Sequence, residues 1–183
     1  MLAVSVLRFA AARDVFEAFP TAYEDIATKP NDQLPLAFLR ELVKGPTPDD
    51  AIPFCAYLLP RREAVQWASQ SVRALVDKPT KYDEIALKAA EDWVRAPEDP
   101  NRRRALQIGT TANQRAASTW VALAAAWSGG PMIVGEYGGG PPAPPQLTSR
   151  AAFTAIRIAL GGKPDRVGCI SQCVERGVRI AER

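Results

Sequence analysis

Proline residues divide this chain into segments about as long as a short helix. The sequence contains 16 prolines, spread from Pro20 to Pro164. A proline in a helix interior removes a hydrogen bond and clashes with the preceding turn, so each one limits how far a helix can extend. Between the prolines, apolar residues recur every three to four positions, and we find no convincing period-two strand pattern. The sequence therefore predicts an all-α fold, an irregular bundle of about eight short, proline-punctuated helices.

The expected helix boundaries follow from apolar stripes and capping residues. The clearest stripe runs over residues 61–76, where apolar side chains share one face. Thr47 is expected to cap a helix that starts at Pro48, and Pro53 makes that helix short or kinked. The other expected helices span residues 13–19, 36–43, 82–94, 100–108, 116–127, 148–160 and 164 to the end of the sequence.

One segment departs from this helical pattern. Between Trp127 and Thr148 the sequence contains six glycines and five prolines. The glycines do not form a dinucleotide-binding fingerprint, because the run Pro-Pro-Ala-Pro-Pro follows them in place of a helix. Such a run favours a stiff, extended backbone. We therefore expect residues 1–183 to form a single helical domain, in which residues 128–147 are a Gly/Pro-rich connecting loop.

Histidine is absent from the sequence. This absence excludes Ser-His-Asp triads, Cys-His dyads and HExxH zinc sites. Cys169 and Cys173 lie one helical turn apart, but only Cys55 remains to complete a metal site with them. We interpret this pair as packing residues. The sequence thus indicates no catalytic residue, no metal site and no cofactor, and we expect an enzyme activity to be absent.

The charges of the chain are nearly balanced. The sequence has 23 basic and 20 acidic residues, a formal net charge of +3, which gives little support to nucleic-acid binding. Arg102, Arg103 and Arg104 point in different directions around a helix, so we interpret them as part of a solvated face. No apolar stretch is long enough to span a membrane, and the N-terminal segment is not a convincing signal peptide. We therefore expect no membrane association and a reducing, cytoplasmic environment.

Two groups of side chains are candidates for binding another protein. The Gly/Pro-rich loop carries apolar residues that need a partner surface, either the protein's own or another's. The second group consists of two arginines at the start of the expected helix 61–76, where a cation opposes the helix dipole unless Glu63 compensates. The candidate partner-binding residues are Trp127, Met132, Ile133, Val134, Tyr137, Arg61 and Arg62.

Three stretches in a fixed order carry a family resemblance. They are TPDDAIPFCAYLLPRREAVQWA from Thr47, KAAEDWVRAPEDPNRRRAL from Lys88 and STWVALAAAWSGG from Ser118. This order resembles a proteobacterial family of small helical proteins of unknown function, often encoded near type VI secretion genes. The resemblance implies no catalytic or ligand residue. It implies an accessory role as an adaptor, a chaperone-like protein or another protein-binding partner of secretion components.

Our leading hypothesis is a non-enzymatic accessory or adaptor protein that binds another protein, a type VI secretion component. The alternative is an immunity-type or regulatory inhibitor of a toxin. A carboxylate-based enzyme is a weaker alternative, since it needs Glu63 to converge with Glu91 or Asp92 in a pocket. Nucleic-acid binding ranks last among these hypotheses.

Overall fold

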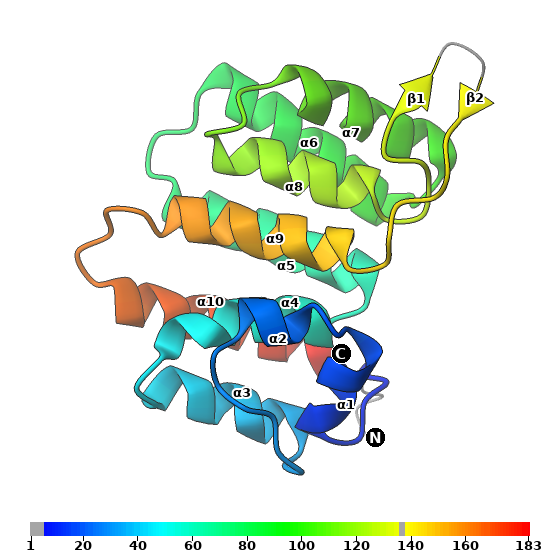
Figure 1. Cartoon of the computed structure of the whole chain (residues 1–183). Helices are drawn as coiled ribbons and strands as arrows, with labels where there is room; N and C mark the ends of the chain where they lie inside the picture. Colours follow the sequence, from blue (N-terminus) through cyan, green and yellow to red (C-terminus); the bar gives the residue numbers. More distant parts are fainter. Residues whose placement is uncertain (1–5, 136–137) are drawn as a thin grey trace. The chain divides into compact units, whose positions relative to one another are not determined.

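The computed structural model describes residues 6–135 and 138–183. Within these ranges the chain forms ten α-helices, one 3-10 helix and a β-hairpin whose two strands have two residues each (Figure 1). The prediction of an all-α, irregular bundle is confirmed. Contacts divide the chain into two compact units. Unit 1 is Met1–Pro60 with Leu160–Arg183, and unit 2 is Arg61–Ala159. The expectation of one domain over residues 1–183 stays a prediction.

Unit 1 is built around one completely buried helix. Every residue of α4 (Ala51–Leu58) is buried, including its large aromatic side chains. Such a helix is apolar on all sides and therefore needs neighbours on all sides. Its neighbours include α2 (Ala22–Asp25), α3 (Pro35–Lys44), η1 (Pro48–Asp50) and α10 (Arg166–Ala181). The remaining helix of the unit is α1 (Ala12–Ala18), which contacts α2.

Pro53 fits inside α4 without a kink being required. The helix begins at Ala51, so Pro53 lies in its first turn, where a backbone N–H has no acceptor within the helix. The 3-10 turn η1 (Pro48–Asp50) leads directly into this first turn. The expectation of a short helix is met by the eight-residue α4, but Pro48 begins the 3-10 turn, and the Thr47 side chain makes no capping hydrogen bond.

The one-turn helix α2 (Ala22–Asp25) was not expected from the sequence. Four residues are too few to form a stable helix by themselves. The hydroxyl of Tyr57 lies 2.9 Å from that of Thr21 and donates to Asp25 at 2.6 Å. Tyr57 lies in α4, so a tertiary contact holds both ends of this turn.

Unit 2 is a bundle of five helices with α8 (Ala117–Ala126) in its centre. All four other helices of the unit contact α8. Nine of its ten residues are buried, and six of the ten are alanine or serine. Figure 1 shows α5 and α9 side by side below α8, with α6 and α7 on its other side. The surrounding helices are α5 (Arg61–Leu75), α6 (Lys81–Arg95), α7 (Asp99–Thr111) and α9 (Leu147–Ala159).

Small side chains allow the helices around α8 to approach it closely. The clearest case is Gly109 of α7, which is buried against Leu123 of α8. A Cβ atom placed on Gly109 would lie 2.7 Å from Leu123 Cδ2 and 2.8 Å from Leu123 Cγ. These distances are too short for ordinary contact, so the spacing of α7 and α8 depends on a glycine here.

The expected Gly/Pro-rich loop, residues 128–147, connects α8 to α9 and carries the β-hairpin. Strand β1 (Val134–Gly135) pairs antiparallel with β2 (Gly138–Gly139). An isolated bridge joins Pro131 to Pro142 in the same antiparallel sense. The amide of Ala143 then donates to the carbonyl of Gly130 at 2.8 Å. The two sides of this connection therefore run alongside each other from its base.

A Gly109→Ala substitution tests the close approach of α7 and α8. The added methyl group favours a helix by about 1 kcal/mol. Overpacking against Leu123 costs about 1–3 kcal/mol, so we expect a net decrease in the free energy of unfolding. Urea denaturation measures this change. Gln107→Ala on the exposed side of α7 is the control and should leave stability within about 0.5 kcal/mol of wild type. A more stable Gly109→Ala protein would contradict the close packing.

Candidate partner-binding site

The connection between α8 and α9 carries two exposed apolar side chains, those of Met132 and Ile133. We define the arm as the described residues 130–135 and 138–143, whose two sides are joined by the β1–β2 pairing and the bridge above. In the arm, Ile133 is 72% exposed and Met132 is 39% exposed. The arm therefore presents apolar side chains to solvent, as the sequence predicted for Met132 and Ile133.

The other candidate residues of this segment have different outcomes. Val134 forms the first residue of β1 through its backbone. Tyr137 lies outside the described residues. Trp127 ends α8 and is partly buried, and its ring packs edge-on against Trp120 with 6.5 Å between the ring centroids. The indole Nε1 of Trp127 is buried and has no hydrogen-bond partner within the described ranges. Trp127 thus packs back onto α8 at the base of the arm.

A buried arginine holds the end of α8 where the arm begins. Arg102 of α7 donates from Nη1 to the carbonyl of Ala126 at 3.2 Å. Its Nε and Nη2 donate to Asp99 at 2.9 and 2.7 Å, and its side chain is only 6% exposed. A Cβ atom on Gly130 would overlap the Arg102 guanidinium group, so the first residue of the arm lies directly against it. A cation beside the last carbonyls of a helix is favourable because of the helix dipole.

This position of Arg102 corrects the interpretation of Arg102, Arg103 and Arg104 as a solvated face. Arg103 and Arg104 are exposed, as expected, but Arg102 is buried. The reason is tertiary: the side of α7 that carries Arg102 packs against α8, and an acceptor at Ala126 receives the buried donor. The sequence contained one indication of this arrangement. Asp99 lies three residues before Arg102, a spacing at which an ion pair can form and allow the arginine to be buried.

Arg61 and Arg62 each reach the C-terminal end of a helix. Arg61 Nη1 donates to the carbonyl of Ser128 just after α8, at 3.4 Å. Arg62 Nε donates to the carbonyl of Val94 near the end of α6, at 2.7 Å. Both residues remain exposed. The structure therefore brings Arg61 to the base of the arm and places Arg62 at another helix end, where both cations meet the negative end of a dipole.

A hollow of about 420 Å³ lies beside the arm. One wall is formed by residues 103, 106, 107 and 110 of α7, whose spacing places them on one face of the helix. The other wall is Ile133 of the arm. The lining residues are Arg103, Leu106, Gln107, Thr110 and Ile133. This stripe of α7 could not be predicted from the sequence, because its residues are a mixture of charged, polar and apolar types with no motif.

The charge of this hollow comes from Arg103. The side chain of Arg103 is 62% exposed and donates from Nε to Asp99 at 2.5 Å. Asp99 also pairs with Arg102, so one carboxylate serves two guanidinium groups. The hydrogen bonds from Arg102 and Arg103 hold the pKa of Asp99 below its ordinary value. Asp99 is therefore ionised at neutral pH, and the three charges sum to one positive charge at the edge of the hollow.

A second hollow, of about 460 Å³, lies between the starts of α6 and α8. Its polar groups are bonded to each other: Ser118 donates to Asp83 at 2.5 Å, and Thr119 donates to the carbonyl of Asn113 at 2.7 Å. Thr80 and Asp83 form the capping box of α6. Because these groups already stabilise the helix starts, the hollow beside the arm is the better candidate for a partner.

Two of the carboxylates that the enzyme hypothesis names, Glu91 and Asp92, are engaged in ion pairs. Glu91 accepts from Arg73 Nε at 2.6 Å and from the Ser69 hydroxyl at 2.7 Å. Partial burial raises the pKa of Glu91, but these hydrogen bonds lower it more, so its pKa lies below the ordinary value. Asp92 pairs with Lys88 and Arg95, each at 3.2 Å. Glu91 is thus held as a carboxylate, not as a proton donor at neutral pH.

The cysteines lie in unit 1, and none of the three forms a disulfide. Cys55 of α4 and Cys173 of α10 are buried, and Cys169 is partly buried. Burial, together with the nearby Cys173, raises the pKa of the Cys55 thiol, which keeps it protonated and weakly nucleophilic. No group of three or more potential metal ligands is found within the part of the chain that the structure describes. No helix in that part is long and apolar enough to cross a membrane.

Comparison with known proteins gives one match. Residues 38–181 match a family described as a family of unknown function (DUF6931). This range includes the whole of unit 2, and with it the arm, α7 and α8, and about half of unit 1. No curated protein and no solved structure matches the chain.

Substitution of Arg102 tests the buried anchor of the arm. Arg102→Leu removes the donor to Ala126 and leaves a buried carbonyl unsatisfied, so we expect the free energy of unfolding to fall by about 1–3 kcal/mol. Arg104→Leu is the matched control: it removes the same charge from an exposed position of the same helix and should change stability by less than about 0.5 kcal/mol. Thermal or urea denaturation compares the two. Equal effects of both substitutions would refute a special role for Arg102.

The lowered pKa of Glu91 predicts a loss of stability in acid. In the unfolded chain Glu91 takes up a proton near pH ~4.3, whereas in the folded protein it does so only at lower pH. Its contribution is therefore fully present above the unfolded pKa and is lost as the pH falls through the folded pKa. Glu91→Gln should be less stable than wild type at pH ~7 and should lose less stability on acidification. Urea midpoints measured from neutral to acid pH should converge for the two proteins; curves that stay parallel would contradict the ion pair.

Proposed function

The chain belongs to the DUF6931 family, and from this premise we propose that it is a non-enzymatic accessory or adaptor protein that binds another protein through the arm. The single observation that carries the proposal is the exposure of Ile133 on an arm whose base is fixed. An isoleucine held in water gains about 1.5–3 kcal/mol when a partner buries it. A protein-binding role uses this free energy directly.

The fixed base of the arm supports its role as a binding segment, because a segment that only links α8 to α9 does not need to be held in place. Arg102 and Arg61 hold the carbonyls at the end of α8, and Trp127 packs on Trp120 at the same place. The Pro131–Pro142 bridge then keeps the two sides of the arm together. A binding segment that is already ordered loses less conformational entropy when it meets a partner. The same contacts therefore favour binding through the described part of the arm.

For the partner, we propose a component of a type VI secretion system, with the protein acting in the bacterial cytoplasm. This part of the proposal rests on the resemblance of the three ordered motifs to a proteobacterial family often encoded near type VI secretion genes. It also rests on the buried thiols Cys55 and Cys173, which form no disulfide and so suit a reducing compartment. The engaged carboxylates Glu91 and Asp92 support a non-enzymatic role.

Affinity capture from the native host tests the proposal. The tagged wild-type protein should enrich at least one type VI secretion component, identified by mass spectrometry. Ile133→Ser should weaken this enrichment by about tenfold, because it removes the apolar side chain that the partner buries. Ile85→Ser is the matched control: Ile85 is also exposed, at 41%, but lies on α6 outside the arm.

The outcomes separate the hypotheses. Capture of a secretion component that depends on Ile133 and is independent of Ile85 supports the proposal. Capture of a toxin whose activity the protein blocks would favour the inhibitor hypothesis. Failure to enrich any protein above an untagged control, with both variants folded like wild type by circular dichroism, would reject a protein-binding role.

A further inference from the structure

We propose that the hollow between α7 and the arm binds an acidic, apolar peptide segment of the partner, with an apolar side chain between Leu106 and Ile133 and a carboxylate on Arg103. This inference rests on the proposed protein-binding function and assigns to it a specific surface and a partner chemistry. All of the residues involved lie in unit 2.

The apolar part of the hollow is formed by two side chains of different exposure. Leu106 is 4% exposed and forms a buried surface on α7, whereas Ile133 is 72% exposed and stands on the arm. The hydroxyl of Thr110 donates to the carbonyl of Leu106 at 2.8 Å, so its polar atom is already satisfied within the helix. A volume of about 420 Å³ accommodates one or two apolar side chains of a bound segment.

The polar part of the hollow can bind a carboxylate. Arg103 uses only its Nε toward Asp99, and both of its terminal amino groups have no partner among residues 6–135 and 138–183. Two such groups in one plane form the usual bidentate pair with a carboxylate. The amide of Gln107, one turn further along the hollow, also has no partner in these ranges and can pair with a backbone carbonyl of the bound segment.

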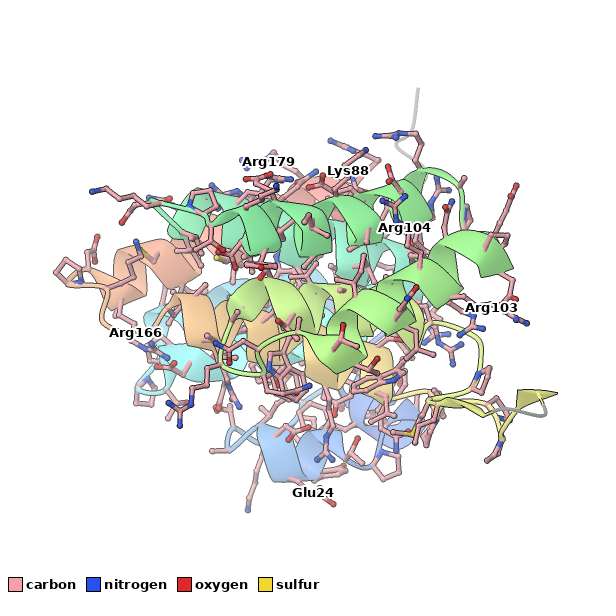
Figure 2. All side chains as sticks on the ribbon, turned by 90° about the horizontal axis from the view of Figure 1, so that it is seen from above. Glu24, Lys88, Arg103, Arg104, Arg166 and Arg179 are labelled. Carbon is pink, nitrogen blue, oxygen red and sulfur yellow. The ribbon has the colours of Figure 1, made fainter. Side chains whose placement is uncertain are left out.

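Charge complementarity favours an acidic partner. The carboxylate of Asp99 is shared between Arg102 and Arg103, so this ion cluster keeps an unbalanced positive charge. Figure 2 shows Arg103 beside the hairpin, whereas Arg104 lies further from it. An acidic segment would thus be attracted to this end of unit 2 before it docks.

The same cations could attract a nucleic acid, but the lining of the hollow does not favour it. Single-stranded nucleic acids are held by aromatic side chains on which bases stack. The lining residues are Arg103, Leu106, Gln107, Thr110 and Ile133, none of which is aromatic. An aliphatic surface beside one bidentate arginine is suited to a leucine or isoleucine that is followed or preceded by Glu or Asp.

Peptide binding tests the inference directly. The probe is a short fluorescein-labelled peptide with leucines one helical turn apart and glutamates between them. Two matched peptides replace either the glutamates with lysine or the leucines with serine. Fluorescence anisotropy with the full-length protein should show binding of the acidic peptide and at least tenfold weaker binding of both matched peptides, since each loses one half of the recognition.

Protein variants locate the site. Arg103→Gln and Ile133→Ser should each weaken binding of the acidic peptide by about tenfold. Arg104→Gln and Ile85→Ser, which alter the same residue types outside the lining, should bind like wild type. If Arg103→Gln alters stability through the lost ion pair with Asp99, the Ile133→Ser variant still tests the site. The exposed side chain of Ile133 contributes little to folding. Circular dichroism and urea midpoints check the fold of each variant.

Several results would overturn the inference. Equal binding of the acidic and lysine peptides removes the role of Arg103, and variants that all bind like wild type place the peptide elsewhere. Tighter, Arg103-dependent binding of a labelled single-stranded oligonucleotide would assign the surface to nucleic acid. If affinity capture from the host still depends on Ile133 while the acidic peptide fails to bind, the protein-binding function stands and only the partner chemistry is wrong. If the peptide binds as expected but no host protein is captured, the surface stands and the adaptor function fails.

Discussion

The packing of α8 is the constraint on which unit 2 depends. This helix contacts all four others of the unit, and nine of its ten residues are buried. Small central side chains let four helices approach one helix closely, and the run of alanines in α8 supplies them. Gly109 shows how closely a neighbouring helix approaches, since an added methyl group there would meet Leu123. In unit 1 the buried helix carries large side chains instead: the rings of Phe16 and Phe38 pack against Phe54 of α4.

The buried end of α8 also determines where the arm starts. The last carbonyl groups of a helix have no N–H donor within the helix, and Arg102 and Arg61 donate to two carbonyls at this end. A buried guanidinium would be unfavourable alone, but Asp99 neutralises it. The consequence for binding is a division of roles along three consecutive arginines of α7. Arg102 holds the arm, Arg103 lines the adjacent hollow, and Arg104 is exposed outside the lining.

The candidate site was predicted from the sequence only in part. The glycines and prolines between α8 and α9 predicted a connection that carries exposed apolar residues, and Met132 and Ile133 are exposed in the structure. Whether these residues bind a partner stays a prediction. Arg61 and Arg62, selected because cations oppose a dipole at their own helix start, donate instead to the carbonyl ends of other helices. The hollow on α7 could not be predicted, because its lining combines a helical stripe with a residue 23 or more positions away in the chain.

The sequence by itself determined the helical class and most helix positions, because proline and apolar periodicity act within a few residues of themselves. It also determined the place of the arm, since no helix can continue through the Gly/Pro-rich segment. Only the tertiary structure decided which of three adjacent arginines is buried, why the one-turn helix α2 forms, and which face of α7 meets Ile133. Each of these depends on a partner distant in sequence: Ala126 for Arg102, Tyr57 for α2 and the arm for α7. Such partners become neighbours only when the helices pack.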